Sequence, residues 1–248
     1  MSEKLKILIV DDDHRMAKTL ADIFKVKGFE VEVAHGGLEA LKKIEEFPFD
    51  SVLTDIKMPQ MNGVDFYKAI KNLQPELPVV LMTAYANDAL VKEGLEAGAI
   101  SVLNKPLDIN LLLSFFSSLR KEHSIVLVDD DANFCKTLGD ILRLRNFAIE
   151  KVSNPHKVMK ALKPDAQVVL LDMNLNSING LDVLKEIREK YPHKPVILVT
   201  GYRKEMASVI ETAHEFSFYT CLYKPFQIKE LLQVLSQIYH QELAKVLS

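Results

Sequence analysis

The sequence predicts an α/β fold made of two doubly wound, five-stranded parallel sheets, arranged as a tandem repeat. Two observations carry this prediction. One pattern of about 120 residues is written twice along the chain, which indicates a duplicated domain. Within each copy, short apolar runs alternate with segments whose apolar residues recur at helical spacing. A chain of 248 residues accommodates two domains of this size.

The repeat is visible as paired segments with a nearly constant offset. ILIVDDDHRMAKTLADIF at residues 7–24 returns as IVLVDDDANFCKTLGDIL at residues 125–142. The later segments PVVLMTAY and LNKPL return as PVILVTGY and LYKPF, at offsets of 117 to 119 residues. We therefore divide the chain into one domain over residues 1–122 and a second over residues 123–248.

The elements of the first copy follow from local patterns. Residues 6–10 form a continuous apolar run, as expected of a strand buried on both faces. Residues 14–27 carry apolar side chains at helical spacing and are followed by Gly28, a helix stop. Strands and helices then continue to alternate, over 31–34, 37–46, 51–55, 63–73, 78–82, 88–97, 100–103 and 108–121. The second copy keeps this order, from a strand over 124–128 to a helix over 228–246.

Composition excludes several classes of protein. The chain is 48% hydrophobic and 26% charged, which is typical of a soluble globular protein, and no charge-free run approaches the length of a membrane span. The net charge is −3 without a long basic run, so direct nucleic-acid binding is not expected. Cys135 and Cys221 form neither a disulfide framework nor a zinc motif. We expect both to be buried as small apolar residues and the protein to be cytoplasmic.

Polar side chains stand where the predicted strands end, and ligands bind at the carboxyl ends of strands in such sheets. In each copy we expect carboxylates, a hydroxyl and an ammonium group to converge there. The first copy supplies Asp11, Asp12, Asp55, Thr83 and Lys105, and the second supplies Asp129, Asp130, Asp172, Thr200 and Lys224. Asp13 and Asp131 complete the two DDD runs and are expected to cap the helices that follow.

This set of groups suits phosphoryl transfer. Three carboxylates brought together raise one another's pKa, and a hard cation such as Mg²⁺ removes that conflict. An aspartate that stays ionised can attack phosphorus, while the lysine and the threonine hydroxyl each take a phosphoryl oxygen. Phosphoryl transfer depends mainly on positioning and charge neutralisation, so little else is required. The pattern therefore predicts magnesium-dependent transfer of a phosphoryl group to an aspartate.

The motifs resemble, twice in tandem, the receiver domain of two-component response regulators, whose fold is flavodoxin-like. The resemblance rests on the strand-end acidic pair, on D-x-x-M-P-x-x-x-G at Asp55–Gly63, on Thr83-Ala84 and on Lys105-Pro106, all in order and repeated. It implies Mg²⁺ as the cofactor and a cis peptide bond before Pro106 and before Pro225.

The resemblance also assigns roles by position. Asp55 and Asp172 would be the phosphoacceptors, Thr83 and Thr200 the switch hydroxyls, and Lys105 and Lys224 the conserved lysines. The metal would be held in the first copy by Asp11, Asp12, Asp55 and the main-chain carbonyl of Lys57. In the second copy it would be held by Asp129, Asp130, Asp172 and the main-chain carbonyl of Asn174.

The implied function is signalling, with self-phosphorylation and autodephosphorylation as the only chemistry. The histidines His14, His35, His123 and His156 match no phosphodonor context and are expected at the surface. The phosphoryl group would therefore come from a histidine kinase or a histidine phosphotransfer protein. Output would pass through contact with a downstream protein partner or through onward transfer of the phosphoryl group in a phosphorelay, or the receivers would act as a phosphate sink. The chain could also form a homodimer.

Departures in the second copy leave alternatives open. Asn176 replaces Pro59, and residues 214–218 replace the Gly98-Ala99 turn, with two extra residues before Lys224. The second receiver could therefore serve only as a dimerisation or docking adaptor, or the pair could be the receiver portion of a longer response regulator.

A metal-dependent phosphatase is disfavoured because Lys57 and Asn174 stand where its second acid would be. A flavin binder is disfavoured because the carboxylates would repel the flavin phosphate.

Two further positions bear on switching and on phosphoryl lifetime. The family often has Tyr or Phe three residues before the lysine, whereas this chain has Val102 and Cys221, so we expect switching through the threonine and loops.

The phosphoryl lifetime depends on two other positions. Two residues after the acceptor, the first copy has Lys57 and the second has Asn174. Two residues after the threonine, both copies have tyrosine, Tyr85 and Tyr202. A carboxamide can hold an attacking water in line, whereas lysine tends to block it. We therefore expect phospho-Asp55 to outlive phospho-Asp172.

Overall fold

The computed structural model describes residues 4–85, 89–119, 123–164, 167–176, 179–201 and 216–247. The predicted tuning residue Tyr202 and the first two residues of 214–218 lie outside this part of the chain. Contacts divide the chain into two units, unit 1 with Met1–Lys121 and Tyr239–Ser248, and unit 2 with Glu122–Ile238. These units are defined by contacts. The division into domains over residues 1–122 and 123–248 stays a prediction.

Unit 1 contains a five-stranded sheet whose strands all pair in parallel, in the order β2-β1-β3-β4-β5. The strands are β1 (Lys6–Val10), β2 (Glu30–Ala34), β3 (Ser51–Asp55), β4 (Val79–Thr83) and β5 (Ser101–Asn104). The helices between and after them are α1 (His14–Val26), α2 (Gly37–Glu46), α3 (Gly63–Leu73), α4 (Ala89–Ala97) and α5 (Ile109–Leu119). The predicted alternation is confirmed, with ends that differ by one or two residues.

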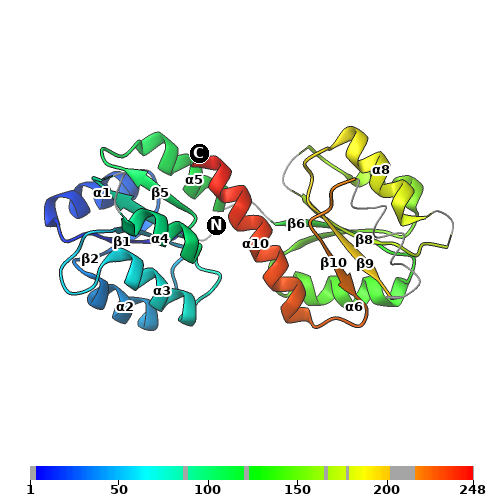
Figure 1. Ribbon diagram of the computed structural model, residues 1–248, viewed down its shortest axis with the longest axis horizontal. Helices are drawn as coiled ribbons and strands as arrows, with labels where there is room; N and C mark the ends of the chain where they lie inside the picture. Colours follow the sequence, from blue (N-terminus) through cyan, green and yellow to red (C-terminus); the bar gives the residue numbers. More distant parts are fainter. Residues whose placement is uncertain are drawn as a thin grey trace. The chain divides into compact units, whose positions relative to one another are not determined.

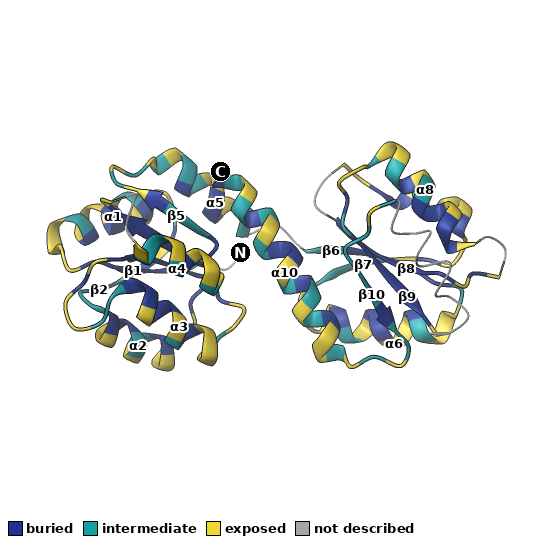
Figure 2. Cartoon of the chain, viewed as in Figure 1, coloured by how far each residue is buried: buried dark blue, intermediate teal, exposed yellow. Residues whose placement is uncertain are grey.

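Helices cover both faces of this sheet, as Figure 1 shows. One buried cluster joins the sheet to α1 and α5, and a second joins it to α2, α3 and α4. The strands β3 and β4 are buried along their whole length, whereas many of the surrounding helix residues are exposed, shown yellow in Figure 2. The apolar runs of the two strands therefore reflect burial on both faces, as the sequence predicts.

The end of the chain contributes to the core of unit 1. Leu243 and Leu247 are 7% and 6% exposed and belong to the same buried cluster as Phe115 and Phe116 of α5. Both leucines lie in the last ten residues, which contacts assign to unit 1. In the sequence these residues belong to the second predicted domain, so the repeat alone would not assign them to unit 1.

Unit 2 contains a second parallel sheet, in the order β10-β9-β8-β6-β7, so the predicted fold class is confirmed in both copies. Its strands are β6 (Ser124–Val128), β7 (Ala148–Val152), β8 (Gln167–Asp172), β9 (Val196–Thr200) and β10 (Thr220–Tyr223). Its described helices are α6 (Ala132–Arg143), α7 (Val158–Ala161), α8 (Gly180–Lys190) and α10 (Ile228–Val246), the last ending among the residues assigned to unit 1. The helix that the repeat predicts between β9 and β10 lies outside the described residues. None of the described helices is long and apolar enough to cross a membrane.

The second helix of unit 2 is much shorter than its counterpart in unit 1. It begins as a 3-10 turn, η1 (Pro155–Lys157), and continues for only the four residues of α7, whereas α2 has ten residues. Pro155 starts the turn, and Pro164 disfavours helical backbone in the residue before it. Two prolines therefore confine the helix to a short segment.

Candidate functional site

The topology brings the predicted site residues of each copy to one edge of its sheet. In unit 1, β1 lies beside β3, β3 beside β4, and β4 beside β5. Asp11 follows β1, Asp55 ends β3, Thr83 ends β4, and Lys105 follows β5. Because all these strands are parallel, their carboxyl ends face the same side, so the four side chains share one site.

Lys105 connects the two buried carboxylates of the first site. Its Nζ lies 2.8 Å from Asp11 Oδ2 and 2.7 Å from Asp55 Oδ1. The main-chain N–H of Lys57 donates to the other oxygen of Asp55, at 3.1 Å, and the N–H of Asp13 donates to Asp11 at 2.9 Å. Asp11 and Asp55 are only 1% and 7% exposed, so these few donors replace most of their hydration.

Burial and pairing shift the pKa values of this site in defined directions. Burial raises the pKa of Asp55 above its ordinary value, because it outweighs the hydrogen bond and charge of Lys105. Burial alone would lower the pKa of Lys105, but its hydrogen bonds to Asp11 and Asp55 outweigh that effect and raise it. The Asp55 carboxylate is therefore held in a setting that penalises its charge, and additional positive charge would relieve that penalty.

Thr83, the last residue of β4, lies at the same edge, and Tyr85 lies in the loop that follows β4. The N–H of Tyr85 donates to Thr83 Oγ1 at 3.0 Å, and Thr83 is buried. The Tyr85 ring is exposed, and Lys57 Nζ lies 4.2 Å from its centroid. The two predicted tuning positions of the first copy are thus in contact, with an ammonium group lying over an aromatic face.

The remaining acidic residues of the first site differ in setting. Asp12 is exposed, and among the described residues the carboxylates of Asp11, Asp12 and Asp55 do not form a group as close as that of Asp129, Asp130 and Asp172. Asp13 accepts hydrogen bonds from the N–H groups of Arg15 and Met16, which confirms it as the N-cap of α1. Those bonds, from Met16 first and then from Arg15, lower the pKa of Asp13.

The second site repeats this arrangement. Lys224 Nζ lies 2.6 Å from Asp129 Oδ2 and 2.7 Å from Asp172 Oδ2. The N–H of Asn174 donates to Asp172 at 2.9 Å, as the N–H of Lys57 does to Asp55. Asp129, Asp172 and Thr200 are buried, and burial raises the pKa of Asp129 against the opposing effect of Lys224.

Three carboxylates converge in the second site in a way that suits a hard cation. Oxygens of Asp129, Asp130 and Asp172 all lie within 4.8 Å of one another. The main-chain N–H of Asn176 donates to Asp130 at 3.1 Å and directs that side chain toward the others. Pro59 occupies the matching position of the first copy and has no N–H to donate. The Pro-to-Asn departure therefore supplies a hydrogen bond that holds Asp130 in the second site.

These donor sets fit a magnesium ion. Mg²⁺ prefers oxygen ligands, usually binds through one or two carboxylates and keeps several waters. The three carboxylates of the second site meet that requirement, and the buried pair Asp11 and Asp55 supplies carboxylate oxygens in the first. The predicted main-chain ligands, the carbonyls of Lys57 and Asn174, belong to the residues that follow each acceptor by two positions.

Several smaller expectations are confirmed or corrected. Both Lys-Pro peptides, before Pro106 and before Pro225, are cis as expected. Asp131 caps α6 as predicted. Cys135 is buried as expected, but Cys221 is only half-buried because it lies on β10, at the edge of the sheet.

The histidines also differ in part from expectation. His14 and His156 are exposed as predicted, whereas His35 and His123 are half-buried. His35 stacks on the His14 ring, with centroids 3.6 Å apart, and its Nδ1 lies 3.3 Å from the main-chain oxygen of Asp11. The His123 ring lies 6.1 Å from the Phe147 ring, which accounts for its partial burial.

Sequence reasoning missed one side chain of the second site. The ring of Phe134 lies beneath Lys224, with Nζ 4.0 Å from the ring centroid. Phe134 belongs to the first turn of α6 and reads as part of an ordinary apolar helix face. The signal in the sequence is a difference between the copies. Three residues after the DDD run, the second copy has the aromatic Phe134 where the first copy has Met16.

A family model for the response regulator receiver domain matches the chain twice, over residues 7–116 and 125–236. The chain is also 29% identical to a response regulator receiver protein of Anaeromyxobacter sp. (strain Fw109-5), over 95% of this chain and 96% of that protein. It is 42% identical over 110 residues to the transcriptional regulatory protein ZraR of Klebsiella oxytoca, an alignment covering 44% of this chain and 25% of ZraR.

Two solved structures are similar to about half of the chain. A CheY-like receiver domain protein from Methanospirillum hungatei JF-1 is 34% identical, with a TM-score of 0.45, over 47% of this chain and 94% of its own. The chemotaxis response regulator CheY4 of Vibrio cholerae is 30% identical, with a TM-score of 0.44, over 47% of this chain and 99% of its own.

Proposed function

The chain belongs to the response regulator receiver domain family, with two such domains in tandem, and from this premise we propose that both domains accept phosphoryl groups from phosphohistidine. The proposed acceptors are Asp55 and Asp172, and the proposed domains cover residues 1–122 and 123–248. One observation carries the proposal. In each domain a lysine ammonium lies within 2.8 Å of both the acceptor carboxylate and the carboxylate that follows the first strand.

The proposed reaction moves one phosphoryl group between proteins. A carboxylate oxygen of Asp55 forms a bond to phosphorus, and the bond between phosphorus and the imidazole nitrogen of the donor breaks. The imidazole keeps the electron pair of that bond and takes up a proton from water. Lys105 then exchanges its contact with Asp55 for a phosphoryl oxygen, and Thr83 donates its hydroxyl hydrogen to another. Asp172, Lys224 and Thr200 take the same roles in the second domain.

Magnesium fits this reaction as the cofactor. When bound, the ion would neutralise charge on the transferring phosphoryl oxygens. The residues proposed to hold it in the second domain are Asp129, Asp130, Asp172 and the carbonyl of Asn174. Those proposed in the first domain are Asp11, Asp12, Asp55 and the carbonyl of Lys57. Asp12 is exposed, so its side chain must turn inward to take part.

The proposed output is a change in protein contacts. A phosphoryl group on the acceptor offers new hydrogen bonds to the threonine and the lysine, so it favours the arrangement in which both reach it. The donor is proposed to be a histidine kinase or a histidine phosphotransfer protein in the cytoplasm. Onward transfer of the phosphoryl group, contact with a downstream protein and formation of a homodimer are the proposed forms of output.

The two domains are proposed to keep the phosphoryl group for different times. Lys57 Nζ lies over the Tyr85 ring beside the first site, and in this proposal the lysine restricts the approach of water to Asp55. Asn174 stands at the matching position of the second site and has a carboxamide that can orient a water. These contacts support the hypothesis that phospho-Asp55 outlives phospho-Asp172.

A second candidate function concerns the second domain alone. Its helix α7 has four residues where α2 has ten, so its surface differs from that of the first domain. A domain with such a surface could act as a docking or dimerisation adaptor while only Asp55 is phosphorylated. The intact pairing of Lys224 with Asp129 and Asp172 favours an active second site over this alternative.

The chemistry is tested by incubating the protein with acetyl phosphate, with and without Mg²⁺. We expect a covalent phosphoryl adduct that forms only with Mg²⁺ and that hydroxylamine removes, because hydroxylamine cleaves acyl phosphates. An adduct that resists hydroxylamine would contradict an aspartyl phosphate. Formation at equal rates in the presence of a chelator would contradict the role of the metal.

A further inference from the structure

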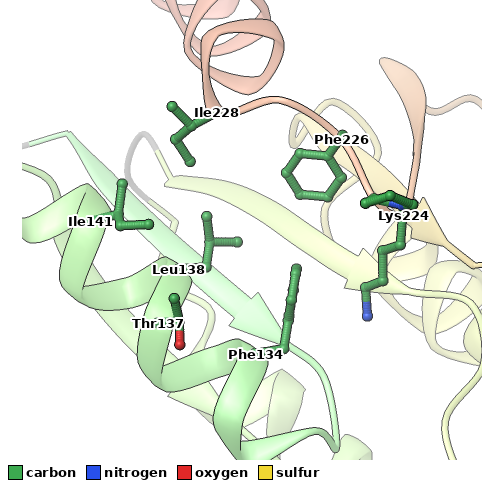
Figure 3. Close-up of a pocket in the computed structure, with 8 residues that line it drawn as sticks. Phe134, Thr137, Leu138, Ile141, Lys224, Phe226 and Ile228 are labelled. Atoms are coloured by element: carbon green, nitrogen blue, oxygen red, sulfur yellow. The ribbon is translucent and has the colours of Figure 1, made fainter.

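Unit 2 contains an apolar pocket next to its phosphoacceptor site. The pocket has a volume of about 440 Å³ and lies between α6 and the segment that leads from β10 into α10. Figure 3 shows its walls and the lysine side chain that borders it. Its lining includes Phe134, Leu138, Ile141, Phe226, Ile228 and Lys224.

Phe134 stands between this pocket and the charged end of Lys224. In Figure 3 its ring is seen edge-on, with Lys224 on one side and Leu138 on the other. The ammonium nitrogen lies 4.0 Å from the ring centroid, within the range of a cation–π interaction. The same nitrogen bonds Asp129 and Asp172. The ammonium therefore has carboxylates and an aromatic face as its neighbours.

The local structure fixes the position of this ring. The N–H of Phe134 donates to the N-cap Asp131 at 3.0 Å, which holds the residue in the first turn of α6. The Phe226 ring meets the Phe134 ring edge-on, with centroids 6.2 Å apart and an angle of 85° between the planes. The N-cap of α6 thus places Phe134 where its ring meets Lys224.

The first copy provides an internal comparison. At the two ring positions it has Met16 in place of Phe134 and Leu107 in place of Phe226. Lys105 bonds its two carboxylates at distances similar to those of Lys224, but the residue at the ring position offers no aromatic face to it. The two sites therefore share their charged groups and differ in the apolar surface beneath the lysine.

We propose that Phe134 is a positioning residue of the second receiver, whose ring holds the Lys224 ammonium beside Asp172 for the incoming phosphoryl oxygen. The inference rests on the proposed function, in which Asp172 accepts the phosphoryl group and Lys224 pairs with it. A lysine has a long, flexible side chain. A fixed aromatic face against the ammonium of Lys224, in addition to its two carboxylate partners, reduces the number of positions that the ammonium occupies before reaction. Groups that are held in place before the reaction stabilise the transition state best.

The test measures phosphorylation of Asp172 by acetyl phosphate in an Asp55→Ala background. Phe134→Met introduces the residue of the first copy and removes the ring, and we expect it to slow phosphorylation about threefold. Phe134→Tyr keeps the ring and should retain the parent rate. Phe226→Leu is the matched control, because it removes an aromatic ring from the same pocket and likewise introduces the residue of the first copy.

A second readout separates positioning from packing damage. The Mg²⁺ concentration that gives half the maximal rate should be the same in all variants, since Phe134 contacts the lysine and not a metal ligand. Equal rates for Phe134→Met and the parent would overturn the proposal, and so would equal slowing by Phe134→Met and Phe226→Leu. If the Asp55→Ala parent forms no adduct at all, the proposed function of the second receiver fails instead.

Discussion

Substitution of Gly63 is predicted to be damaging, because its missing side chain leaves room for the backbone of Asp55, the proposed acceptor. A Cβ atom built on Gly63 would lie 2.1 Å from the main-chain oxygen of Asp55 and 3.0 Å from its carbonyl carbon. Side-chain Cβ atoms essentially never approach other atoms within 3.0 Å, so Gly63→Ala must displace the Asp55 peptide by at least about 0.9 Å. Overpacking against rigid backbone costs about 2 kcal/mol. For a domain of this size, that loss lowers the melting temperature by about 6–10 °C.

The same displacement acts on the chemistry. A reacting group moved by about 1 Å loses on the order of a hundredfold in rate. We therefore expect Gly63→Ala to slow phosphorylation of Asp55 by about that factor while leaving Asp172 unaffected. Thermal unfolding followed by circular dichroism measures the first effect. Intact-mass spectrometry in an Asp172→Ala background, with acetyl phosphate and Mg²⁺, measures the second.

Substitutions at two other glycines, Gly180 and Gly36, serve as comparisons for Gly63→Ala. At Gly180 the nearest backbone atoms are 2.6 Å away, so Gly180→Ala should affect the second domain in the same way but less severely. A Cβ on Gly36 would meet nothing within 4 Å, and its φ of 169° is extended backbone, so Gly36→Ala should change the melting temperature little. If Gly63→Ala and Gly36→Ala unfold at the same temperature and Asp55 is phosphorylated normally in both, the steric argument is refuted.

Three further predictions concern lifetime, acid strength and the core. Lys57→Asn should shorten the lifetime of phospho-Asp55 about tenfold, because a carboxamide can position water where lysine blocks it, and an unchanged decay rate by mass spectrometry would contradict this. Burial raises the pKa of Asp55 in the folded state. The folded protein therefore loses stability as pH rises from the ordinary value of 3.8 through the raised pKa and Asp55 ionises. Asp55→Asn should therefore raise the melting temperature at pH 7 without Mg²⁺, and the gain should vanish below pH 3.8, whereas a lower melting temperature at pH 7 would argue against the burial effect. Leu243→Ala should destabilise unit 1 by about 3 kcal/mol, visible as faster amide hydrogen exchange in β5, and unchanged exchange there would show that the last ten residues do not support its core.

Much of the fold was predictable because the repeat and the apolar runs are strong, independent signals. Buried parallel strands read as continuous apolar segments, and β3 and β4 are buried throughout, so their limits were predicted to within one residue. The short helix α7 was not predictable from the repeat, because the prolines at 155 and 164 have no counterparts in α2 of the first copy. The place of Leu243 and Leu247 was also missed, since helical periodicity does not specify which sheet a helix end packs against.

The charged groups of the sites were predictable for a different reason. Strand ends in a parallel sheet converge, so Asp11, Asp55 and Lys105 had to meet once the strands were identified. The apolar neighbours of the lysine were not, because Phe134 on α6 looks like any core-facing residue of an amphipathic helix. The role of Asn176 was hidden as well, since it acts through its main-chain N–H, which every residue except proline possesses.

The central claim is that each domain carries its own phosphoacceptor, and intact-mass spectrometry tests it most directly. The wild type, Asp55→Ala, Asp172→Ala and the double variant are each incubated with acetyl phosphate and Mg²⁺. We predict two phosphoryl adducts on the wild type, one on each single variant and none on the double variant. Loss of every adduct in Asp55→Ala would contradict an active second site, and adducts that persist on the double variant would contradict both assignments.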